Sequence, residues 1–253
     1  MLNDALIGYT GFVGGNILKQ QAFDAVYNSE NIETIQGKQF GLIVCAGAPG
    51  TKWVANKNPN ADKTNIELLI KNLKTTSCQK LVLISTIDVY PQPLKGFDEN
   101  FPIDESRLTA YGKHRHMLEK FVQNNFNALI IRLPGIFGEG LKKNIIYDLM
   151  RGSALDANPK SIFQFYRLNS LWPDINKALK NEVKILNIAT EPIQLKELAQ
   201  KIFGLSLPGQ KTKVPVYYDM CTKHARLWGM DKPYLYSKTQ VLDDLKTFVK
   251  NSG

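Results

Sequence analysis

The stretch Gly8-Tyr9-Thr10-Gly11-Phe12-Val13-Gly14 decides the fold of this chain. It follows the apolar run Ala5-Leu6-Ile7 and leads into a helical pattern of apolar residues at Val13, Ile17 and Leu18. A strand, a glycine turn and a helix N-terminus in this order form a diphosphate-binding site, because glycines let the backbone approach the phosphates and the first N–H groups of the helix donate to them. The spacing is G-x-x-G-x-x-G and not the more familiar G-x-G-x-x-G, so a plain tight turn is the alternative interpretation.

Composition indicates an ordinary globular protein. The 253 residues, 43% of them hydrophobic, suffice for a full core. No apolar run approaches about 18 residues and the N-terminus lacks a secretory pattern, so we expect a cytoplasmic protein without membrane contact. The three cysteines are far apart, which fits reduced thiols. His114 and His116 are two residues apart and point to different faces of a helix, so no metal site is expected.

The net charge of +9 is spread along the chain, with small clusters at Lys142-Lys143 and Lys211 to Lys213. Nucleic-acid binders usually concentrate basic residues on one face or tail. A diffuse positive charge fits the attraction of a negatively charged small molecule, such as a nucleotide diphosphate. We therefore expect a small-molecule partner and no nucleic acid.

The first half of the chain alternates strand and helix patterns, which predicts a parallel sheet covered on both faces. The strand patterns are Ala5–Tyr9, Ala22–Tyr27, Gly41–Ala46, Lys80–Ser85 and Ala128–Leu133, and the helical patterns are Val13–Gln20, Ala61–Leu73 and Leu108–Phe126. Only about a dozen residues separate the second strand from Gly41, too few for a strand–helix–strand crossover. The sequence therefore predicts an α/β, Rossmann-type doubly wound sheet that is shortened at this point.

The second half mixes short elements. The patterns are Lys143–Met150, Ile162–Tyr166, Leu171–Leu179, Lys184–Ile188, Ile193–Phe203, Val214–Tyr218 and Ser237–Val249, with a loop at Leu205–Lys213. We expect a sheet domain over residues 1–133 and a small substrate lobe over residues 134–253, interwoven with the sheet.

Tyr111-Gly112-Lys113-His114-Arg115 opens the helix before the strand Ala128–Leu133. Residues four apart share a helix face, so Tyr111 and Arg115 point the same way and Lys113 points nearly opposite. A cation beside a tyrosine favours the phenolate and lowers the pKa toward that of a general acid/base. The alternative is that Tyr111 packs against the sheet and Arg115 is solvated.

The strand Leu81–Ile84 ends in Ser85-Thr86-Ile87-Asp88-Val89-Tyr90-Pro91. Ligands of open parallel sheets bind at the carboxyl ends of strands, where a hydroxyl can bond a substrate oxygen. A simple Ser/Thr turn is the alternative.

In this order, and along nearly the whole chain, these segments resemble the extended short-chain dehydrogenase/reductase family, the NAD-dependent epimerase/dehydratase group that works mostly on nucleotide sugars. Further matching segments are Cys45-Ala46-Gly47-Ala48 at a strand end, Asn65 in the following helix, Arg132 to Gly138, and Leu186-Asn187-Ile188 with Leu195 to Leu198.

The resemblance implies roles for individual residues. It implies that the catalytic residues are Thr86, Tyr111 and Arg115, and that the substrate contacts are Thr86, Asp88, Tyr90 and Asn144. The residues it implies at NAD or NADP are Gly8, Thr10, Gly11, Phe12, Val13, Gly14, Asn28, Ser29, Ala46, Gly47, Ala48, Asn65, Tyr111, Arg115, Pro134 and Ile136.

Three departures from the family matter. Arg115 replaces the lysine that contacts the nicotinamide ribose, and arginine has a different geometry. The stretch Tyr27 to Asn31 offers no clearly placed acid for NAD and no arginine for a 2′-phosphate, so NAD and NADP both stay open. Ile87 stands where sugar dehydratases have an aspartate, so dehydration is not expected.

The resemblance thus implies an NAD(P)-dependent oxidoreductase or epimerase (an isomerase) acting on a nucleotide-linked sugar or a related carbonyl/hydroxyl substrate. Tyr111 would be the general acid/base, and Arg115 would hold the ribose and favour the phenolate. Because lysine is the family's residue, Arg115→Lys is expected to keep activity. The alternative is a catalytically silent NAD(P)-binding or sensor protein of the same fold. Members of the family often pair through helices that include the tyrosine helix, so the resemblance also implies a homodimer.

Overall fold

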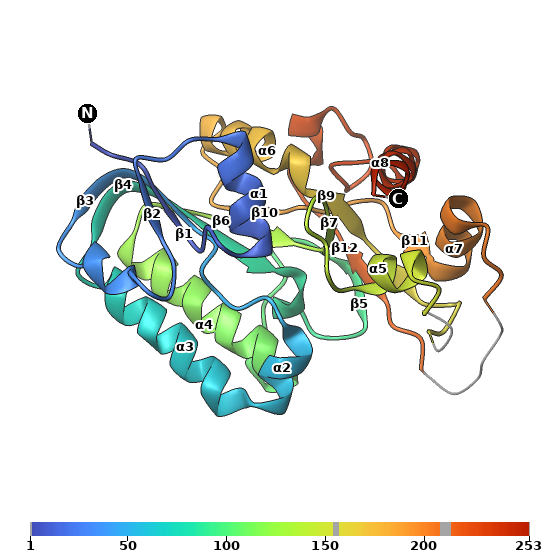
Figure 1. Cartoon of the computed structure of the whole chain (residues 1–253), viewed down its shortest axis with the longest axis horizontal. Helices are drawn as coiled ribbons and strands as arrows, with labels where there is room; N and C mark the ends of the chain where they lie inside the picture. The colour runs from blue at the N-terminus through green and yellow to red at the C-terminus, as the bar shows by residue number, and fades with distance from the viewer. Residues whose placement is uncertain (1, 154–156, 208–213, 253) are drawn as a thin grey trace. The chain divides into compact units, whose positions relative to one another are not determined.

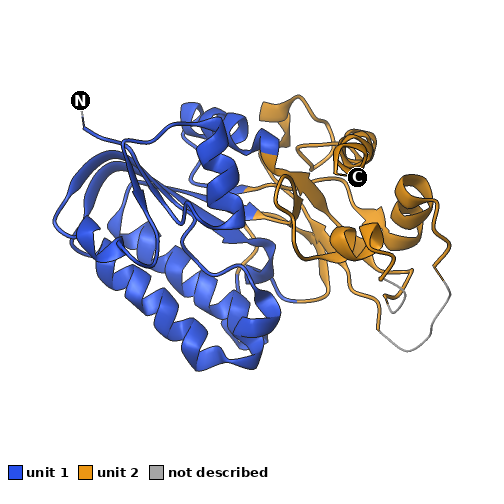
Figure 2. Ribbon diagram, in the orientation of Figure 1, with its two compact units in different colours: residues 1–91, 103–132, 169–186 blue, residues 92–102, 133–168, 187–253 orange. Residues whose placement is uncertain are grey.

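The structure is a computed structural model that describes residues 2–153, 157–207 and 214–252 (Figure 1). The chain forms two compact units (Figure 2). Unit 1 comprises Met1–Pro91, Ile103–Arg132 and Asn169–Leu186, and unit 2 comprises Gln92–Pro102, Leu133–Leu168 and Asn187–Gly253. One boundary between the units falls between Arg132 and Leu133; unit 2 also contains Gln92–Pro102, and unit 1 also contains Asn169–Leu186.

The elements alternate as the patterns predict. The helices are α1 Phe12–Gln20, α2 Lys52–Lys57, α3 Pro59–Leu73, α4 Ala110–Asn125, α5 Ile145–Met150, α6 Leu171–Lys180, α7 Leu195–Phe203 and α8 Lys238–Asn251. The strands are β1 Ala5–Ile7, β2 Ala25–Tyr27, β3 Gln39–Cys45, β4 Ser77–Thr86, β5 Leu94–Phe97, β6 Ala128–Leu133, β7 Gly135–Phe137, β8 Ile162–Phe163, β9 Phe165–Arg167, β10 Ile185–Asn187, β11 Ile193–Gln194 and β12 Tyr218–Met220. Short 3₁₀ turns are η1 Ile32–Ile35, η2 Ile87–Val89, η3 Glu105–Arg107, η5 Leu168–Ser170 and η6 Ala225–Trp228.

The central sheet has six strands in the order β10-β6-β4-β3-β1-β2. Strands β2, β1, β3 and β4 pair in parallel. In this register Ile7 lies beside both Tyr27 and Cys45, and Cys45 lies beside Leu83. The carboxyl ends of these strands therefore meet at one edge, and this edge carries the candidate site.

The predicted shortening is confirmed. A single 3₁₀ turn, η1, connects β2 to β3, and its Ile32 and Ile35 are buried against the sheet. The chain then crosses β1 and pairs on its other side, so β2 is the edge strand. A turn of this length closes the connection without a crossover helix.

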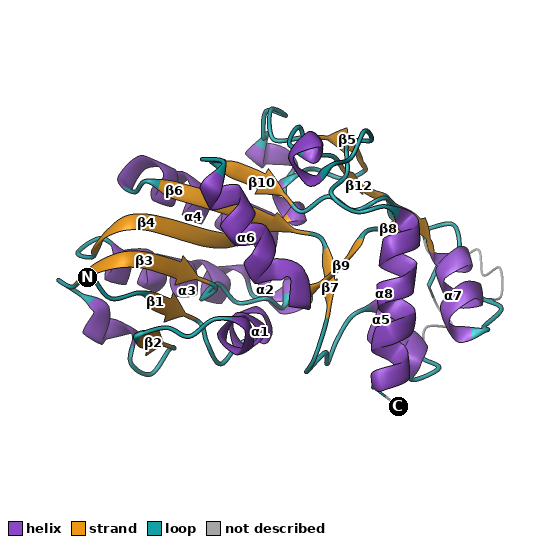
Figure 3. Cartoon of the chain, turned by 90° about the horizontal axis from the view of Figure 1, so that it is seen from above, coloured by secondary structure: helices purple, strands orange, loops and turns teal. Residues whose placement is uncertain are grey.

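Helices cover both faces of the sheet in unit 1. Helices α3 and α4 lie on one face, and α1 and α6 lie on the other (Figures 1 and 3). The apolar strand residues Ile7, Ile43 and Leu81 share one core cluster with Ile66 of α3 and Leu118 of α4. Apolar strand runs and amphipathic helices thus produce the layers that the sequence predicts.

Unit 2 has its own core, in which Phe137, Phe165 and Leu198 pack with Leu245. Helix α8 begins with a capping box between Ser237 and Gln240. Three small two-stranded ladders join β7 to β9, β8 to β11 and β5 to β12.

Strand details in unit 2 differ from the predictions. The strand expected at Ile162–Tyr166 is two strands, because buried Gln164 interrupts it and donates to the Met220 carbonyl at 2.7 Å. Strand β5 was not anticipated, and β12 begins at Tyr218, where the expected strand ends. Most of the expected loop Leu205–Lys213 lies outside the described residues.

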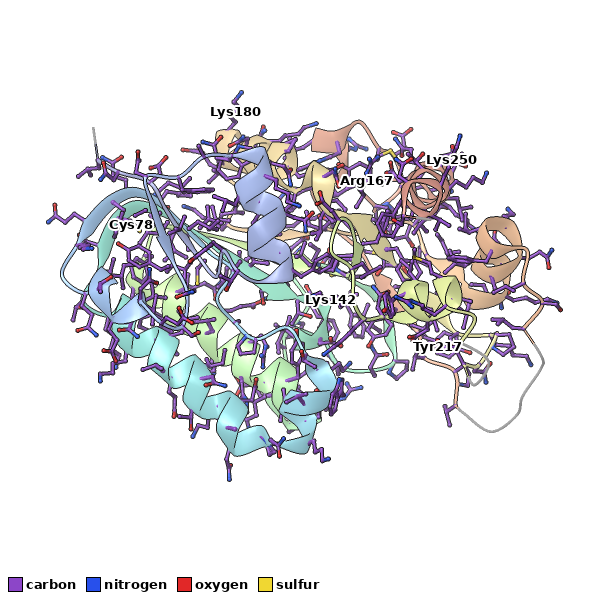
Figure 4. The ribbon with its side chains drawn as sticks, viewed as in Figure 1. Cys78, Lys142, Arg167, Lys180, Tyr217 and Lys250 are labelled. Carbon is purple, nitrogen blue, oxygen red and sulfur yellow. The ribbon has the colours of Figure 1, made fainter. Side chains whose placement is uncertain are left out.

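The basic residues are dispersed in the structure, as in the sequence. Lys142 before α5, Lys180 at the end of α6 and Lys250 near the end of α8 are all exposed (Figure 4). Across the described ranges, none of the helices combines the length and apolar character needed to span a membrane.

Candidate active site

The three glycines of the first turn differ in their structural roles. Gly8 has a left-handed φ of +86°, and a Cβ there would overlap the Ala46 carbonyl. A Cβ on Gly14 would overlap the Gly8 carbonyl. Gly11 has an ordinary φ of −78°, and its Cβ would meet only the Gly8 oxygen at 3.2 Å. The fold thus requires Gly8 and Gly14, whereas Gly11 keeps open space at the start of α1.

The N-terminus of α1 is free to bind an anion. Gly11 is its N-cap, and no side chain caps the helix in the part of the chain that the structure describes. The N–H groups of Phe12, Val13 and Gly14 in the first turn have no acceptor within the helix. Thr10 beside them is exposed. These donors fit a diphosphate group.

Two further loops follow strands at the same edge of the sheet. The Asn28 side chain after β2 accepts from the N–H groups of Glu30, at 2.9 Å, and Asn31, at 3.3 Å. Ser29, which follows Asn28 in this turn, is exposed. The loop Ala46–Ala48 follows β3, and Ala46 N donates to Ile7 O at 2.8 Å. A Cβ on Gly47 would meet Ile7 Cγ2 at 2.9 Å, so glycine lets this loop pack on β1.

Tyr111 and Thr86 lie together. A Cβ on Gly112 would overlap the Asp88 carbonyl, so this glycine lets α4 approach the turn η2 that follows β4. The approach brings the Tyr111 phenol close enough to the Thr86 side chain for the two to interact. Thr86 Oγ1 also accepts from Asp88 N at 3.2 Å, which fixes the threonine at the strand end.

The pKa of Tyr111 is raised, which overturns the expected lowering. Burial of the phenol, whose residue is 8% exposed, is the largest cause and disfavours the phenolate. The Arg115 charge lowers the pKa but does not outweigh burial, and the Asp88 carboxylate raises the pKa further. Tyr111 is therefore a neutral phenol near pH 7, the form that donates a proton.

Arg115 shares the buried helix face with Tyr111, so the solvated alternative is wrong. Its guanidinium carbon lies 3.9 Å from the centre of the Tyr111 ring. Nη2 donates to Asp62 Oδ1 at 2.9 Å and also to the Pro49 carbonyl. Nη1 donates to Asp62 Oδ2 and to the Tyr111 carbonyl at 3.3 Å. The Nη donors, which the resemblance implies would hold a ribose, are thus bound to protein groups. Buried Nε has no partner among the described residues.

Asp62 is a site residue that the sequence analysis missed. It is 5% exposed on α3 and accepts from His114 Nδ1 at 2.7 Å as well as from Arg115. Burial by itself raises the pKa of Asp62, but the bonds from Arg115 and His114 outweigh it and bring the pKa below 3.8. The signal was its helical spacing with buried Ile66 and Leu69.

Asn65, expected at the cofactor, is exposed on α3. The buried face of this helix carries Asp62 together with Ile66 and Leu69. The expectation rested on the motif match. The apolar periodicity of the helix selects a different face.

Tyr90, expected at the substrate, belongs to a second buried cluster. It is 2% exposed, and its hydroxyl accepts from Arg132 Nη1 at 2.7 Å. Arg132 Nη2 donates to Glu119 Oε2 at 2.7 Å, and Ser85 donates to Glu119 Oε1 at 2.5 Å. Burial lowers the pKa of Arg132, but the Glu119 carboxylate outweighs it and raises the pKa overall. The hydroxyl of Tyr90 is thus engaged by the protein.

Lys52 of α2 is another residue that the motifs did not single out. Its Nζ lies 2.6 Å from Asp88 Oδ1. Asp88, expected at the substrate, therefore has a cationic partner beside Thr86.

Pro134, Ile136 and Asn144 belong to unit 2, and their expected ligand roles stay predictions. Asn144 Oδ1 caps α5 by accepting from Ile146 N at 3.0 Å, and its Nδ2 donates to Ile136 O at 2.8 Å. In residues 2–153, 157–207 and 214–252, no group of three or more His, Cys, Asp or Glu side chains could hold a metal ion.

Solved structures share this fold, although no protein-family model and no curated protein matches the sequence. A dTDP-4-dehydrorhamnose reductase from Bacillus anthracis in complex with NADP is 19% identical with a TM-score of 0.73, covering 99% of this chain and 99% of that chain. A dTDP-4-dehydrorhamnose reductase from Yersinia enterocolitica is 16% identical with a TM-score of 0.74, covering 98% of both chains. A UDP-N-acetylglucosamine 4-epimerase from Methanobrevibacter ruminantium, in complex with UDP-N-acetylmuramic acid, is 12% identical with a TM-score of 0.72, covering 98% of this chain and 97% of that chain.

These likenesses establish the fold. The chain has the Rossmann-type architecture of nucleotide-sugar reductases and epimerases over nearly its whole length. The resemblance predicted from the order of the motifs is therefore confirmed at the level of the fold.

Proposed function

We propose that the protein is an NAD(P)-dependent reductase of a keto group on a nucleotide-linked sugar. The observation that carries the proposal is the buried, protonated phenol of Tyr111, which interacts with the Thr86 side chain at the carboxyl edge of the sheet. A neutral phenol suits proton donation to the oxygen of a carbonyl that is being reduced. The structural neighbours named above include reductases, one of them in complex with NADP.

The chain's own residues have distinct tasks in this proposal. The N–H groups at the start of α1 hold the dinucleotide diphosphate, and Gly11 leaves the space for it. Thr86 positions the substrate oxygen beside Tyr111, which donates its proton to that oxygen. Arg115 supports the tyrosine ring. When bound, the dinucleotide supplies the hydride.

Epimerisation with the same residues is the second candidate, since an epimerase from Methanobrevibacter ruminantium shares the fold. A silent dinucleotide-binding protein is favoured by one observation, the engagement of the Arg115 guanidinium by Asp62 and Pro49. We also propose that residues 134–253 bind the substrate and that the protein forms a homodimer.

The first experiment measures turnover of nucleotide-linked 4-keto sugars with NADH and with NADPH. Reduction confirms the proposal, and binding of either dinucleotide without turnover of any sugar supports the silent protein. Absence of both binding and turnover contradicts the whole assignment.

The glycine turn is tested by calorimetry with NADPH and NADH. Gly11→Ala is expected to weaken binding at least about tenfold, because its methyl group occupies phosphate space; thermal unfolding is measured beside affinity, since the Cβ also lies a tight 3.2 Å from Gly8 O. Gly15→Ala is the matched control, because its Cβ would meet Tyr9 O at an ordinary 3.4 Å. Equal affinity of the two variants would show that the diphosphate does not bind here.

A further inference from the structure

Position 115 lies between a buried carboxylate and a tyrosine ring, and the side chain serves both. The edge of the guanidinium faces Asp62, both of whose oxygens accept from it. The central carbon of the same group lies over the Tyr111 ring, 3.9 Å from its centre. Only a planar cation with several donors can use its edge and its face at once.

Asp62 requires this cation. Its side chain is 4% exposed, and an unpaired carboxylate at such depth is strongly unfavourable. Arg115 supplies donors from Nη1 and Nη2, and His114 of α4 supplies one more. The acid on α3 and the arginine on α4 therefore form one unit.

A lysine at position 115 would behave differently. Its ammonium is a compact charge without a flat face. The nearest buried carboxylate is Asp62, so the ammonium would pair there. It could not also cover the Tyr111 ring and reach the Pro49 carbonyl, as the guanidinium does.

We propose that Asp62 is the positioning residue that makes arginine, and not lysine, the working side chain at position 115. This inference rests on the proposed function, in which Tyr111 donates the proton. It reverses the expectation that Arg115→Lys keeps activity.

Several charged groups surround Tyr111. Arg115 lies on α4, Asp88 on η2 and Lys52 on α2, and all three act on the phenol. Asp62 of α3 and His114 lie behind Arg115. The variants below change only Asp62 and Arg115, so Asp88 and Lys52 act equally in all of them.

The test compares the wild type with Arg115→Lys, Asp62→Asn and the double variant. The first readout is kcat/KM for the keto-sugar reduction across pH. The second needs no substrate: 3-fluorotyrosine is incorporated, and ¹⁹F NMR follows the Tyr111 resonance, which Tyr111→Phe assigns. This second readout separates a failure of the inference from a failure of the proposed function.

Arg115→Lys is expected to lower kcat/KM about tenfold or more and to raise the pKa of Tyr111, because Asp62 draws the ammonium away. Removing that acid frees the ammonium, so the double variant recovers to within about threefold of the wild type, and the pKa falls back. Asn72→Leu combined with Arg115→Lys is the control. Asn72 is a buried polar residue of α3, the helix that carries Asp62, and its side chain accepts from Gln36. Its replacement should restore neither kcat/KM nor the pKa of Tyr111.

A wild-type rate and titration in Arg115→Lys would overturn the inference, and so would a folded double variant no better than Arg115→Lys. Thermal unfolding of each variant shows which are folded. If Asp62→Asn alone is unstable, Arg115→Lys and the double variant still decide, since neither leaves a buried guanidinium opposite an amide.

Discussion

Helix α4 contributes to two buried arginine–carboxylate pairs, and the comparison between them tests the proposed function. Asp62 with Arg115 and Glu119 with Arg132 are both almost fully buried. Each arginine also lies over a tyrosine ring, at 3.9 Å for Tyr111 and 5.0 Å for Tyr90. In chemical composition the two clusters are nearly the same.

The two clusters differ in how many of their hydrogen-bonding groups find partners within the protein. All three nitrogens of Arg132 donate to Glu119 or Tyr90, so the tyrosine hydroxyl closes the cluster. Nε of Arg115 has no partner among the described residues, and the Tyr111 hydroxyl interacts with the Thr86 side chain at the strand end. The donors of the closed cluster are satisfied within the protein, whereas the open cluster keeps one buried donor without a partner among the described residues.

The largest expected effect comes from removing each tyrosine hydroxyl in turn. Tyr111→Phe is expected to lower turnover about 10²–10⁴-fold, because the proton donor is lost, with little change in stability. Tyr90→Phe leaves a donor of Arg132 unpaired, so it should cost about 1–3 kcal/mol of unfolding free energy with turnover retained. Steady-state kinetics and urea unfolding of both variants check the contrast. The reverse pattern would exchange the roles of the two clusters.

The next effect concerns the closed cluster as a whole. Glu119→Ala leaves the Arg132 charge buried and Ser85 without its acceptor, and should cost about 3–5 kcal/mol of unfolding free energy. Glu67→Ala is the control, because its pair with Lys63 is about half exposed and should cost less than about 1 kcal/mol. Equal losses in urea unfolding would mean that the buried pair contributes no more than a surface pair.

The smallest effect is a pH dependence that comes from Asp62 in the open cluster. The folded-state pKa of Asp62 lies below its usual 3.8, so its stabilisation is fully present above that value and is lost as the pH falls through the folded pKa. The gap in unfolding free energy between the wild type and Asp62→Asn should therefore narrow as the pH is lowered from about 5 to about 3. Urea unfolding at several pH values measures it. A gap that widens on acidification would contradict the assigned ionisation.

The sequence predicts the sheet well because its signals are local. The glycine turn, the apolar strand runs and the short connection before Gly41 each determine an element within a few residues. The common face of Tyr111 and Arg115 follows from helical spacing in the same way. Asp62 and Lys52 were missed because their partners, Arg115 and Asp88, are far away in the sequence. Burial of Tyr111, which reverses the expected direction of its pKa, is likewise a property of packing and not of spacing.

The short connection through η1 also determines how the sheet ends. With the crossover gone, β2 is the boundary strand on this side; β10 bounds the other side, and each has only three residues. An exposed strand edge is a template on which another chain can add a strand, and short edge strands are one way in which proteins suppress that pairing. The truncated sheet thus offers little backbone for edge-to-edge aggregation on either side.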